Sequence, residues 1–318
     1  MTDKSFTTVV IGAGALGGMY AQKIAETGYP VAFLADGERA DRLERNGLVV
    51  NGTPLRIPVV RSTRAREDAA PVPDLILVAV KNHHMTETTE ILSRICAPDT
   101  TVLSVMNGID SEHRIATALG ETFEPNDDGR VLHCMVAGMD AVRDESTITY
   151  TRLGTVYVGR KQNDLASLDG RVQRAKEFFD TVGIPATVAA DMDKAIWNKF
   201  MLNVGINQWS AVLRAPYRAF HRPGSAQTLM RMAMNEVLSI ARARSIDLTA
   251  DDMERWFGVV ATLSADGKTS MLQDIDAGRK TEVEMFAGRV VEIGRETGVA
   301  TPVNDVLLEA IHAIESGL

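Results

Sequence analysis

A glycine-rich segment near the N-terminus constrains the fold more than any other feature of this chain. Gly12-Ala13-Gly14-Ala15-Leu16-Gly17 has the spacing GxGxxG, follows a β-rich run at 6–11 and precedes a helical pattern at 19–27. In this context Gly12 permits a tight turn, Gly14 lets the backbone approach a pyrophosphate, and Gly17 lets helix and strand pack closely. The helix N-terminus then offers N–H groups to phosphates. The alternative is a plain glycine-rich turn between a strand and a helix.

Strand-like and helix-like segments alternate through the first half of the chain. The strongest strand patterns lie at 6–11, 31–35, 74–80 and 101–106, with helical patterns at 85–95 and 111–119 between them. This alternation predicts a parallel sheet covered by helices on both faces. Short β-like runs between 131 and 158 predict an extension of the sheet.

After about residue 191 the strand patterns stop, and helical patterns continue to the C-terminus. Thr281-x-x-Glu284 has the form of a capping box, and Thr301-Pro302 that of a cap followed by proline. We therefore predict an α/β fold, with a Rossmann-type doubly wound sheet over 1–190 and an all-helical substrate and catalytic domain over 191–318.

Charge and composition exclude several classes of function. The 318 residues carry a formal net charge of -8, and no run of Lys and Arg stands out, so we expect neither nucleic acid nor a membrane surface as partner. No apolar run approaches the roughly 20 residues that span a bilayer. The two cysteines, Cys96 and Cys134, form no CxxC, which favours a reducing compartment. We expect a cytoplasmic protein.

Polar residues follow three of the predicted strands. Asp36 ends the second strand, where a carboxylate accepts hydrogen bonds from the ribose 2′-hydroxyl of NAD(H) and repels the 2′-phosphate of NADP(H). Arg39 follows closely and could reverse this preference by reaching a phosphate. Lys81 and Asn107 follow the next two strands at the sheet edge where ligands of such folds bind. The alternatives are an Asp-Gly turn, a solvated lysine and an Asn-Gly turn.

Lys199, Asn203 and Asn207 recur at every fourth position of an otherwise apolar helical segment. This spacing puts all three on one stripe of the helix. An amide buried without a partner costs roughly 1–3 kcal/mol, so the stripe needs partners within the protein or a polar ligand. The alternative to a ligand is that the asparagines bridge neighbouring helices while Lys199 extends to water.

Three histidines invite comparison with a metal site. His83 and His84 are adjacent, so on a helix start they point in different directions, and no carboxylate completes a ligand spacing with them or with His133. We predict no metal.

Five segments, taken together, make the sequence resemble the ketopantoate reductase (2-dehydropantoate 2-reductase) family. They are GAGALGG at 12–18, VKN at 80–82, MNGID at 106–110, WNKFMLNVGIN at 197–207 and SMLQDIDAGRKTEVE at 270–284. They occur in the family's order and span nearly the whole chain. The resemblance implies NAD(P)H-dependent reduction of 2-dehydropantoate to pantoate in pantothenate biosynthesis, with NADP(H) as the family's cofactor.

The resemblance also implies two catalytic roles. Lys199 matches the lysine that acts as general acid, and Glu282 matches the glutamate near the substrate hydroxyl and the nicotinamide ribose. The chemistry agrees, because hydride transfer to a ketone leaves negative charge on oxygen, which an ammonium group stabilises and protonates. The alternative role for Glu282 is compensation of the dipole at a helix start.

The remaining matches are binding residues. Asn203 and Asn207 match the asparagines that hold the substrate, and Ser270 matches the serine that binds its carboxylate. Asn107 matches an asparagine shared by cofactor and substrate, and Lys81 matches the lysine after the fourth strand.

Two departures from the family pattern keep alternatives open. Members that use NADP have a basic residue where this chain has Asp36, so NAD(H) is the alternative cofactor. Members often carry a substrate-contacting asparagine after the proline where this chain has Pro216-Tyr217, so the substrate could be a different 2-oxo acid. A third alternative is a dinucleotide-binding sensor without turnover, which would not need Lys199. A small 2-oxo acid is the expected partner, and a homodimer is left open.

Overall fold

The computed structural model describes residues 4–62, 72–123 and 128–317. Its contacts divide the chain into two compact units. Unit 1 comprises Met1–Met106 and Asp110–Asp193, and unit 2 comprises Asn107–Ile109 and Lys194–Leu318. The short segment Asn107–Ile109 therefore belongs to unit 2, although the residues before and after it in the sequence belong to unit 1.

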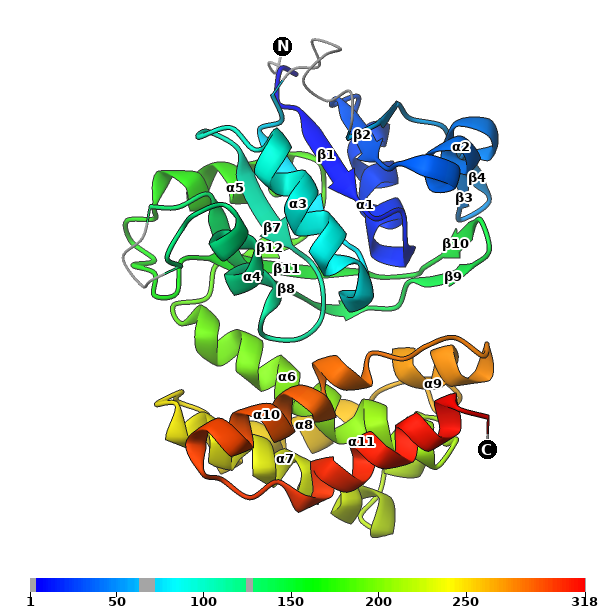
Figure 1. The fold of residues 1–318 in the computed structure, drawn as a ribbon, viewed down its shortest axis with the longest axis vertical. Coiled ribbons are helices and arrows are strands. Elements are labelled where there is room, and N and C mark those ends of the chain that lie inside the picture. The colour runs from blue at the N-terminus through cyan, green and yellow to red at the C-terminus, as the bar shows by residue number, and fades with distance from the viewer. Residues whose placement is uncertain (1–3, 63–71, 124–127, 318) are drawn as a thin grey trace. The chain divides into compact units, whose positions relative to one another are not determined.

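Unit 1 is built on an eight-stranded sheet with the strand order β12-β11-β8-β7-β6-β1-β2-β5 (Figure 1). The strands are β1 (Thr8–Ile11), β2 (Val31–Leu34), β5 (Val59–Val60), β6 (Leu75–Val78), β7 (Thr101–Ser104), β8 (Val131–Met139), β11 (Leu153–Gly159) and β12 (Ala186–Thr187). Six neighbouring strands of this sheet, in the spatial order β8-β7-β6-β1-β2-β5, pair in parallel. β1 lies between β2 and β6, which is the strand order of a dinucleotide-binding sheet. The predicted Rossmann-type α/β fold is confirmed.

Helices cover both faces of this sheet, as its apolar strands require. α1 (Ala15–Glu26) and α5 (Gly170–Thr181) pack on one face, where Leu75 and Leu77 of β6 join their core. α3 (Met85–Ile95) and α4 (Ser111–Ala118) are joined by their own contacts, and Figure 1 shows α3 across the near side of the sheet. All four residues of β6 are buried, because each face of the strand meets a helical layer.

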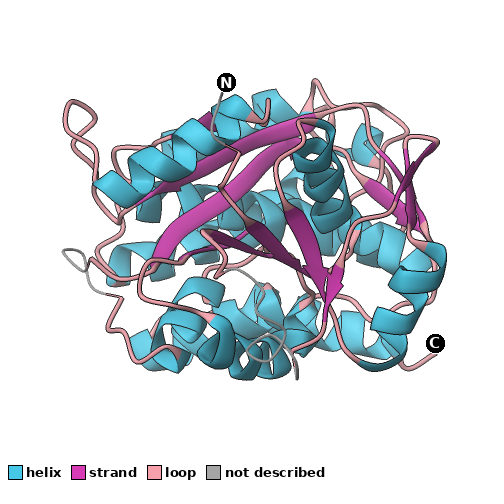
Figure 2. Cartoon of the chain, turned by 90° about the horizontal axis from the view of Figure 1, so that it is seen from above, coloured by secondary structure: helices cyan, strands magenta, loops and turns pink. Residues whose placement is uncertain are grey.

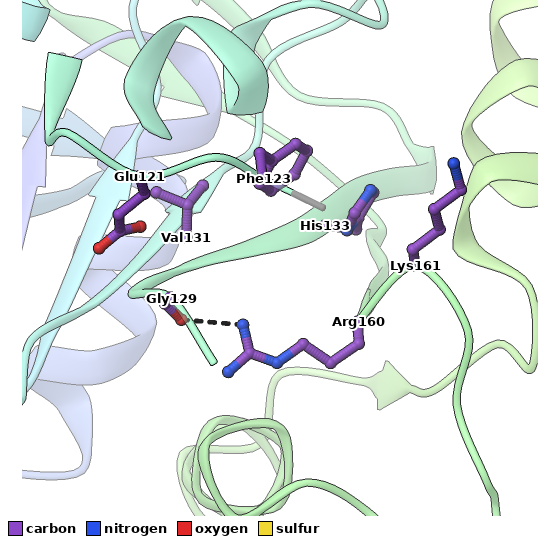
Figure 3. Close-up of a pocket in the computed structure, with 7 residues that line it drawn as sticks. All are labelled: Glu121, Phe123, Gly129, Val131, His133, Arg160 and Lys161. Carbon is purple, nitrogen blue, oxygen red and sulfur yellow. Dashed lines mark hydrogen bonds between the residues drawn. The ribbon is translucent and has the colours of Figure 1, made fainter. Parts of the chain in front are cut away.

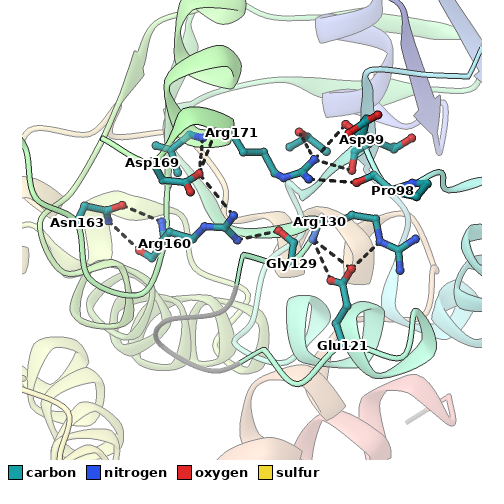
Figure 4. Close-up of polar contacts among 12 residues, drawn as sticks. Pro98, Asp99, Glu121, Gly129, Arg130, Arg160, Asn163, Asp169 and Arg171 are labelled. Carbon is teal, nitrogen blue, oxygen red and sulfur yellow. Dashed lines mark hydrogen bonds and ion pairs between the residues drawn. The ribbon is translucent and has the colours of Figure 1, made fainter. Parts of the chain in front are cut away.

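A hydrogen-bond network ties the end of the sheet to α5 (Figure 4). The Arg171 guanidinium donates to the backbone oxygens of Pro98, Asp99 and Thr100 at 3.0–3.2 Å. Arg160 donates to the oxygen of Gly129 at 2.8 Å, next to the start of β8. These bonds hold loops that have no regular secondary structure of their own.

The β-like runs between 131 and 158 were predicted to extend the main sheet, but only part of that segment does so. The rest belongs to a second, smaller sheet in unit 1, with the strand order β4-β3-β10-β9, which the sequence analysis did not foresee. It consists of β3 (Leu48–Val50), β4 (Thr53–Leu55), β9 (Val142–Asp144) and β10 (Thr147–Thr149). α2 (Gly37–Asn46), also missed, leads from β2 into this sheet. The strands have at most three residues each, too short for a period-2 pattern to be distinguished from a loop.

The regular secondary structure in the described residues of unit 2 consists of helices, which are cyan in Figure 2. Its elements are α6 (Met192–Val212), η2 (Tyr217–Phe220), α7 (Ser225–Ala243), α8 (Ala250–Val260), α9 (Ser270–Asp276), η3 (Val283–Met285), α10 (Ala287–Thr297) and α11 (Pro302–Glu315). These helices share one apolar core. Its buried residues include Phe200 of α6, Met234 of α7 and Phe286, which lies between η3 and α10. The predicted helical second domain is confirmed. None of the helices in the described parts of the chain is both long and apolar enough to cross a bilayer.

The two capping signals predicted from the sequence had different outcomes. Thr281 and Glu284 form no capping box, because α10 begins only at Ala287, so that prediction was wrong. Thr301 is the N-cap residue of α11 and Pro302 its first residue, as predicted, but the Thr301 side chain makes no capping hydrogen bond. The caps come instead from other helices of unit 2. Gln208 Oε1 accepts from Ala287 N at 3.0 Å, and the Glu236 carboxylate accepts from the backbone of α11 at 2.8 and 2.9 Å.

Candidate active site

The glycine loop between β1 and α1 has a backbone conformation that leaves no room for a Cβ atom at two of its positions. Gly12 has φ +104°, and a Cβ there would lie 2.6 Å from the oxygen of Ala79. A Cβ on Gly17 would lie 1.9 Å from the oxygen of Gly12, so no side chain fits where the helix meets the strand. Only glycine tolerates both the positive φ and this backbone approach. The roles predicted for Gly12 and Gly17 thus match their surroundings.

The start of α1 suits a phosphate-bearing ligand. Gly14 is the N-cap residue and supplies no side-chain cap, so the N–H groups of the first turn depend on other acceptors. Ala13, Ala15 and Leu16 complete the loop with small or apolar side chains. Uncapped N–H groups and the positive end of the helix dipole attract phosphate oxygens. These residues therefore fit the pyrophosphate of a dinucleotide.

Asp36, which follows β2, has a partner of its own in the structure. Its carboxylate accepts hydrogen bonds from the backbone N–H of Ser62, at 2.9 Å, and from the Ser62 hydroxyl. Ser62 is buried, and it follows β5, the strand next to β2. Asp36 thus ties two strand ends together, which the sequence analysis did not foresee. Lys81 lies half-buried after β6, as the N-cap residue of η1 (Asn82–His84).

Unit 2 brings together three predicted site residues that are far apart in sequence. Lys199 of α6 donates from Nζ to Oδ1 of Asn107 at 3.0 Å. Asn107 in turn donates from Nδ2 to Oε2 of Glu282 at 3.4 Å. The Asn107 amide thus bridges an ammonium and a carboxylate. Its orientation follows, because the amide oxygen must face the ammonium and the amide NH₂ the carboxylate. We call these three residues the amine cluster.

A glycine lets Asn107 reach this position. Gly108 has φ +91°, and a Cβ there would lie 2.6 Å from Cγ of Met285 in η3. Ile109, the next residue, packs against the apolar core of unit 2. The chain after β7 therefore enters the helical unit through a turn that favours glycine, and this turn puts Asn107 beside Glu282. The sequence analysis had placed Asn107 at a strand end or in an Asn-Gly turn, with a role in binding cofactor and substrate implied by the resemblance, but it did not foresee this entry into the helical unit.

The asparagines of the α6 stripe have no side-chain partner within residues 4–62, 72–123 and 128–317. Asn207 is 7% exposed, and neither it nor the half-buried Asn203 makes a side-chain hydrogen bond with any described residue. Lys199 is also half-buried. Bridging of neighbouring helices, the alternative weighed from the sequence, therefore does not explain these amides. A buried amide without a partner costs roughly 1–3 kcal/mol, which a polar ligand would recover.

Ser270 has no recorded contact with the amine cluster. It is the exposed first residue of α9, and Thr269 caps that helix by accepting from Leu272 N at 3.2 Å. The structure thus joins Lys199, Asn107 and Glu282 through hydrogen bonds and leaves Asn203 and Asn207 on the same helix stripe as Lys199. It shows no hydrogen bond from Ser270 to any of these described residues.

Arg143 is a residue near the glycine loop that the sequence analysis missed. It lies on β9 of the small sheet and donates to the oxygen of Ala13 at 2.5 Å. Nothing in the local sequence signals this contact, because 130 residues separate the two partners.

A small pocket lies elsewhere in unit 1 (Figure 3). It is lined by Glu121, Phe123, Gly129, Val131, His133, Arg160 and Lys161, and has room for about one water molecule. Phe123 stacks on His133 with ring centroids 4.3 Å apart. None of the residues predicted to bind cofactor or substrate lines this pocket, and its size leaves no room for either.

Beneath His133 lies the carboxyl group of Glu112, which is buried. Its Oε2 accepts from the Ser111 hydroxyl at 2.8 Å, and its Oε1 accepts from Cys134 N at 3.3 Å. Burial raises the pKa of Glu112, and these hydrogen bonds and the His133 charge only partly oppose the effect. Across the residues that the structure describes, no group of three or more His, Cys, Asp or Glu side chains is arranged to hold a metal ion.

Comparison with known proteins supplies a family for these two units. The family model described as "Ketopantoate reductase PanE/ApbA" matches residues 8–163, and the model of the family's C-terminal part matches residues 191–315. Among curated proteins, the 2-dehydropantoate 2-reductase of Archaeoglobus fulgidus is 28% identical over 309 residues, covering 97% of this chain and 98% of that protein. The 2-dehydropantoate 2-reductase of Halobacterium salinarum is 28% identical over 306 residues, covering 96% and 97%.

Solved structures share the fold at lower identity. The 2-dehydropantoate 2-reductase of Methylococcus capsulatus superposes with a TM-score of 0.80 at 24% identity, covering 98% of this chain and 97% of that one. A D-mandelate dehydrogenase with NADH and anilino(oxo)acetate superposes with a TM-score of 0.81 at 22% identity, covering 98% and 99%. The two family models together match most of the residues, and the predicted resemblance is confirmed: the chain belongs to the ketopantoate reductase PanE/ApbA family.

Proposed function

We propose that this chain is a NAD(P)H-dependent 2-dehydropantoate 2-reductase, which reduces the C2 ketone of 2-dehydropantoate to the hydroxyl of pantoate in pantothenate biosynthesis. The observation that carries the proposal is the amine cluster, in which Lys199 lies 3.0 Å from the Asn107 amide and that amide bridges to Glu282. The family assignment and the names of the relatives support the choice of substrate.

The glycine loop, from Gly12 to Gly17, binds the dinucleotide in this proposal. The N–H groups at the start of α1 meet the pyrophosphate, and Asp36 and Lys81 lie at the ends of β2 and β6, where the rest of such a ligand binds. The dinucleotide, when bound, supplies the hydride that the ketone carbon accepts.

Lys199 holds the proton that the reaction consumes. As hydride reaches the ketone carbon, negative charge grows on the ketone oxygen, and the Lys199 ammonium stabilises this charge and donates its proton. The hydrogen bond to Asn107 Oδ1 keeps the ammonium in one position, so little reorganisation is needed during the reaction. Glu282 fixes the Asn107 amide from its other side. On the family resemblance, we assign its carboxylate to accept from a hydroxyl of the ligand.

Asn203 and Asn207 hold the substrate in this account. Their amides lie on the Lys199 face of α6 and lack partners among the described residues, so they can donate to a carboxylate and accept from a hydroxyl. Ser270, exposed at the start of α9, is assigned the substrate carboxylate on the family resemblance alone.

Oxidation of NADPH and NADH in the presence of 2-dehydropantoate tests the proposal. We expect turnover with at least one of the two cofactors, and pantoate as the product. Well-folded protein that binds a dinucleotide yet turns over 2-dehydropantoate with neither cofactor would exclude this substrate.

A second candidate function is reduction of a different 2-oxo acid. Tyr217 in η2 stands where the family often has an asparagine, and a Cβ on Gly267 would meet its ring at 3.0 Å, so the tyrosine packs closely against that turn. Because the fold is similar to that of a D-mandelate dehydrogenase, aryl 2-oxo acids should be tested as well. A panel of branched and aryl 2-oxo acids ranks the substrates by kcat/KM. A non-catalytic sensor remains the third candidate, and any Lys199-dependent turnover excludes it.

A homodimer is the assembly we propose. The observation behind it is the fold likeness to a ketopantoate reductase of Staphylococcus aureus that is described as dimeric, with a TM-score of 0.75. Light scattering on the purified chain measures the mass directly.

A further inference from the structure

The last turn of α11, the red helix of Figure 1, contacts the segment of unit 2 that carries Glu282. Glu315 Oε1 accepts a hydrogen bond from the backbone N–H of Thr281 at 2.7 Å. His312 Nε2 lies 2.8 Å from Oε1 of Glu284, and it carries the shared proton because an ionised carboxylate can only accept. The two contacts therefore fall on either side of Glu282 in the sequence.

The segment around Glu282 has little regular structure of its own. Between α9 and α10, the described residues form one element, the three-residue turn η3. Residues 277–280 are exposed. The Thr281 hydroxyl accepts from Val283 N at 3.2 Å, and the backbone oxygen of Glu282 accepts from Met285 N at 3.0 Å. A single turn of 3₁₀-helix is weak by itself, so contacts from neighbouring helices must fix the backbone at Glu282.

The contact that Glu315 makes is the stronger of the two. Thr281 is 6% exposed, so water cannot readily replace the acceptor of its N–H, and a hydrogen bond to a carboxylate is stronger than one between neutral groups. The side chains of His312 and Glu284 are 39% and 55% exposed, and an exposed ion pair contributes little. The position of Thr281, and with it that of Glu282, therefore depends mainly on Glu315.

The stability of α11 itself does not account for Glu315. This residue is the last of α11, where the negative end of the helix dipole disfavours a carboxylate. The bond that it accepts from Thr281 N offsets this unfavourable interaction. The contact with Thr281, rather than its own helix, thus explains a carboxylate at this position.

The amine cluster depends closely on where Glu282 lies. Its Oε2 accepts from Asn107 Nδ2 at 3.4 Å, which is near the upper limit for such a bond, whereas Asn107 Oδ1 accepts from Lys199 Nζ at 3.0 Å. Displacement of Glu282 by about 1 Å would break the first bond and remove a support of the Asn107 amide. Misplacement by about 1 Å, even through residues away from the reacting atoms, can cost about 10²-fold in rate.

We propose that Glu315 is a positioning residue for the ketone reduction. It acts through Thr281 N to hold Glu282 against the Asn107 amide, and so keeps the Lys199 ammonium in its reactive position. The proposal rests on the proposed function, because it assumes that Lys199 protonates the ketone oxygen. Glu315 itself touches neither substrate nor cofactor in this account. Its loss should therefore slow the chemical step and spare dinucleotide binding, which the glycine loop provides.

The alternative is that Glu315 only stabilises unit 2. A double-mutant cycle separates the two roles, because residues that act through one another have non-additive effects and independent residues have additive ones. If Glu315 acts through Glu282, its removal should matter only while the Glu282 carboxylate is present. A residue that merely stabilises the fold would change kcat by the same factor in either background.

The cycle consists of the wild-type chain, Glu315→Ala, Glu282→Ala and the double variant, assayed well below their melting temperatures with the 2-oxo acid that the wild-type chain reduces fastest. We expect Glu315→Ala to lower kcat about 5- to 50-fold and to leave the Kd of the dinucleotide within about twofold. In the Glu282→Ala background the same change should lower kcat less than about twofold.

Conservative variants identify the hydrogen bond as the cause. Glu315→Gln keeps an oxygen that can accept from Thr281 N, so kcat should stay within about threefold of the wild-type value. Should Glu315→Ala fail to fold, Glu315→Asp replaces it in the cycle, since it keeps the charge but shortens the reach to Thr281 N by one methylene. Circular dichroism of each variant checks folding.

Glu309→Ala is the matched control on the same helix. Glu309 is exposed, makes no side-chain hydrogen bond or ion pair within the parts of the chain that the structure describes, and its loss changes the net charge equally. It should leave kcat within about twofold, since exposed charges away from a site are largely screened. His312→Ala should lower kcat less than about threefold, because the pair that His312 forms with Glu284 is exposed.

Three results would overturn the proposal: Glu315→Ala leaves kcat unchanged, it lowers kcat equally in both backgrounds, or Glu315→Gln loses as much activity as Glu315→Ala. A wild-type chain that reduces no 2-oxo acid would overturn the proposed function together with this proposal. Turnover by the wild-type chain, combined with any of the three results, would overturn this proposal alone.

Discussion

The glycine loop of unit 1 and the amine cluster of unit 2 are assembled in opposite ways. The loop is six consecutive residues, and its close backbone contacts are made within the loop, between Gly17 and Gly12, and with Ala79, the residue after β6. The amine cluster joins residues 92 and 175 positions apart, and it exists only because Asn107–Ile109 packs with the helices. One site is encoded by local sequence, and the other by tertiary packing.

This difference predicts how each site responds to substitution. A change within the glycine loop should act through backbone strain, and so reduce the stability of unit 1 and the affinity for the dinucleotide together. A change within the amine cluster should act on the chemical step and leave dinucleotide affinity intact. The four predictions below are ordered by the size of the expected effect.

Replacing Lys199 with alanine should have the largest effect. General acid catalysis is typically worth about 10²–10⁴-fold, so kcat should fall by at least about 10²-fold while the dissociation constant of the dinucleotide changes little. Steady-state kinetics and fluorescence titration measure the two quantities. Lys194→Ala is the matched control on the same helix, because Lys194 pairs with Asp247 at 2.8 Å and takes no part in the proposed reaction. A drop in dinucleotide affinity matching the drop in kcat would erase the distinction between the two sites.

Replacing Gly17 with alanine should damage unit 1. Its Cβ would lie 1.9 Å from the Gly12 oxygen, so the helix must move away from the strand at a cost of about 1–3 kcal/mol or more. Thermal unfolding and dinucleotide titration should both worsen. Gly170→Ala is the control at the start of α5, where a Cβ meets nothing within 4 Å. Unchanged dinucleotide affinity in Gly17→Ala would show that the close approach is not needed for binding.

Replacing Glu236 with glutamine should destabilise unit 2 without affecting the glycine loop. The carboxylate accepts from Val303 N, Asn304 N and Asn304 Nδ2, and an amide in its place turns one acceptor into a donor that faces other donors. Leaving one buried group without a partner costs about 1–3 kcal/mol, which urea unfolding can detect. Glu254→Gln, in an exposed ion pair with Arg231, should change stability much less. Equal losses in the two variants would show that the α11 cap is unimportant.

Glu112 should give unit 1 a small pH dependence of stability. Burial raises its pKa in the folded chain, so folding favours the protonated carboxyl group. Its contribution is therefore fully present below the usual pKa of a glutamate and is lost as pH rises through the raised folded value. Glu112→Gln should flatten this part of the stability curve, and melting temperatures between pH 4 and pH 8, in steps of about one unit, measure it. A curve with an unchanged slope in the variant would assign the dependence to another group.

Local patterns were enough to predict the sheet, the glycine loop and the helical character of unit 2. Each depends on residues within one element: the buried run of β6, the GxGxxG spacing, and the 3.6-residue period of helices such as α7. Elements of two or three residues, such as β5 and β9, were missed because they are held by pairing with distant strands.

The candidate site was predictable only in part. The stripe on α6 and the position of Asn107 after a strand were visible in the sequence, and the family resemblance added Glu282. The bridge that Asn107 makes between Lys199 and Glu282, the Ser62 partner of Asp36, and the reach of Arg143 to Ala13 were not visible. Each joins residues at least 26 positions apart, and no periodicity encodes contacts at such distances.

Chemical rescue tests the central claim, that Lys199 donates the proton, most directly. The rate of a single turnover of NADPH and 2-dehydropantoate is measured in Lys199→Ala at increasing concentrations of methylammonium. If the ammonium of Lys199 is the donor, the slow rate of the variant should rise with the added amine, while Lys194→Ala shows no such response. A Lys199→Ala protein that reduces the ketone at the wild-type rate without any amine would contradict the account.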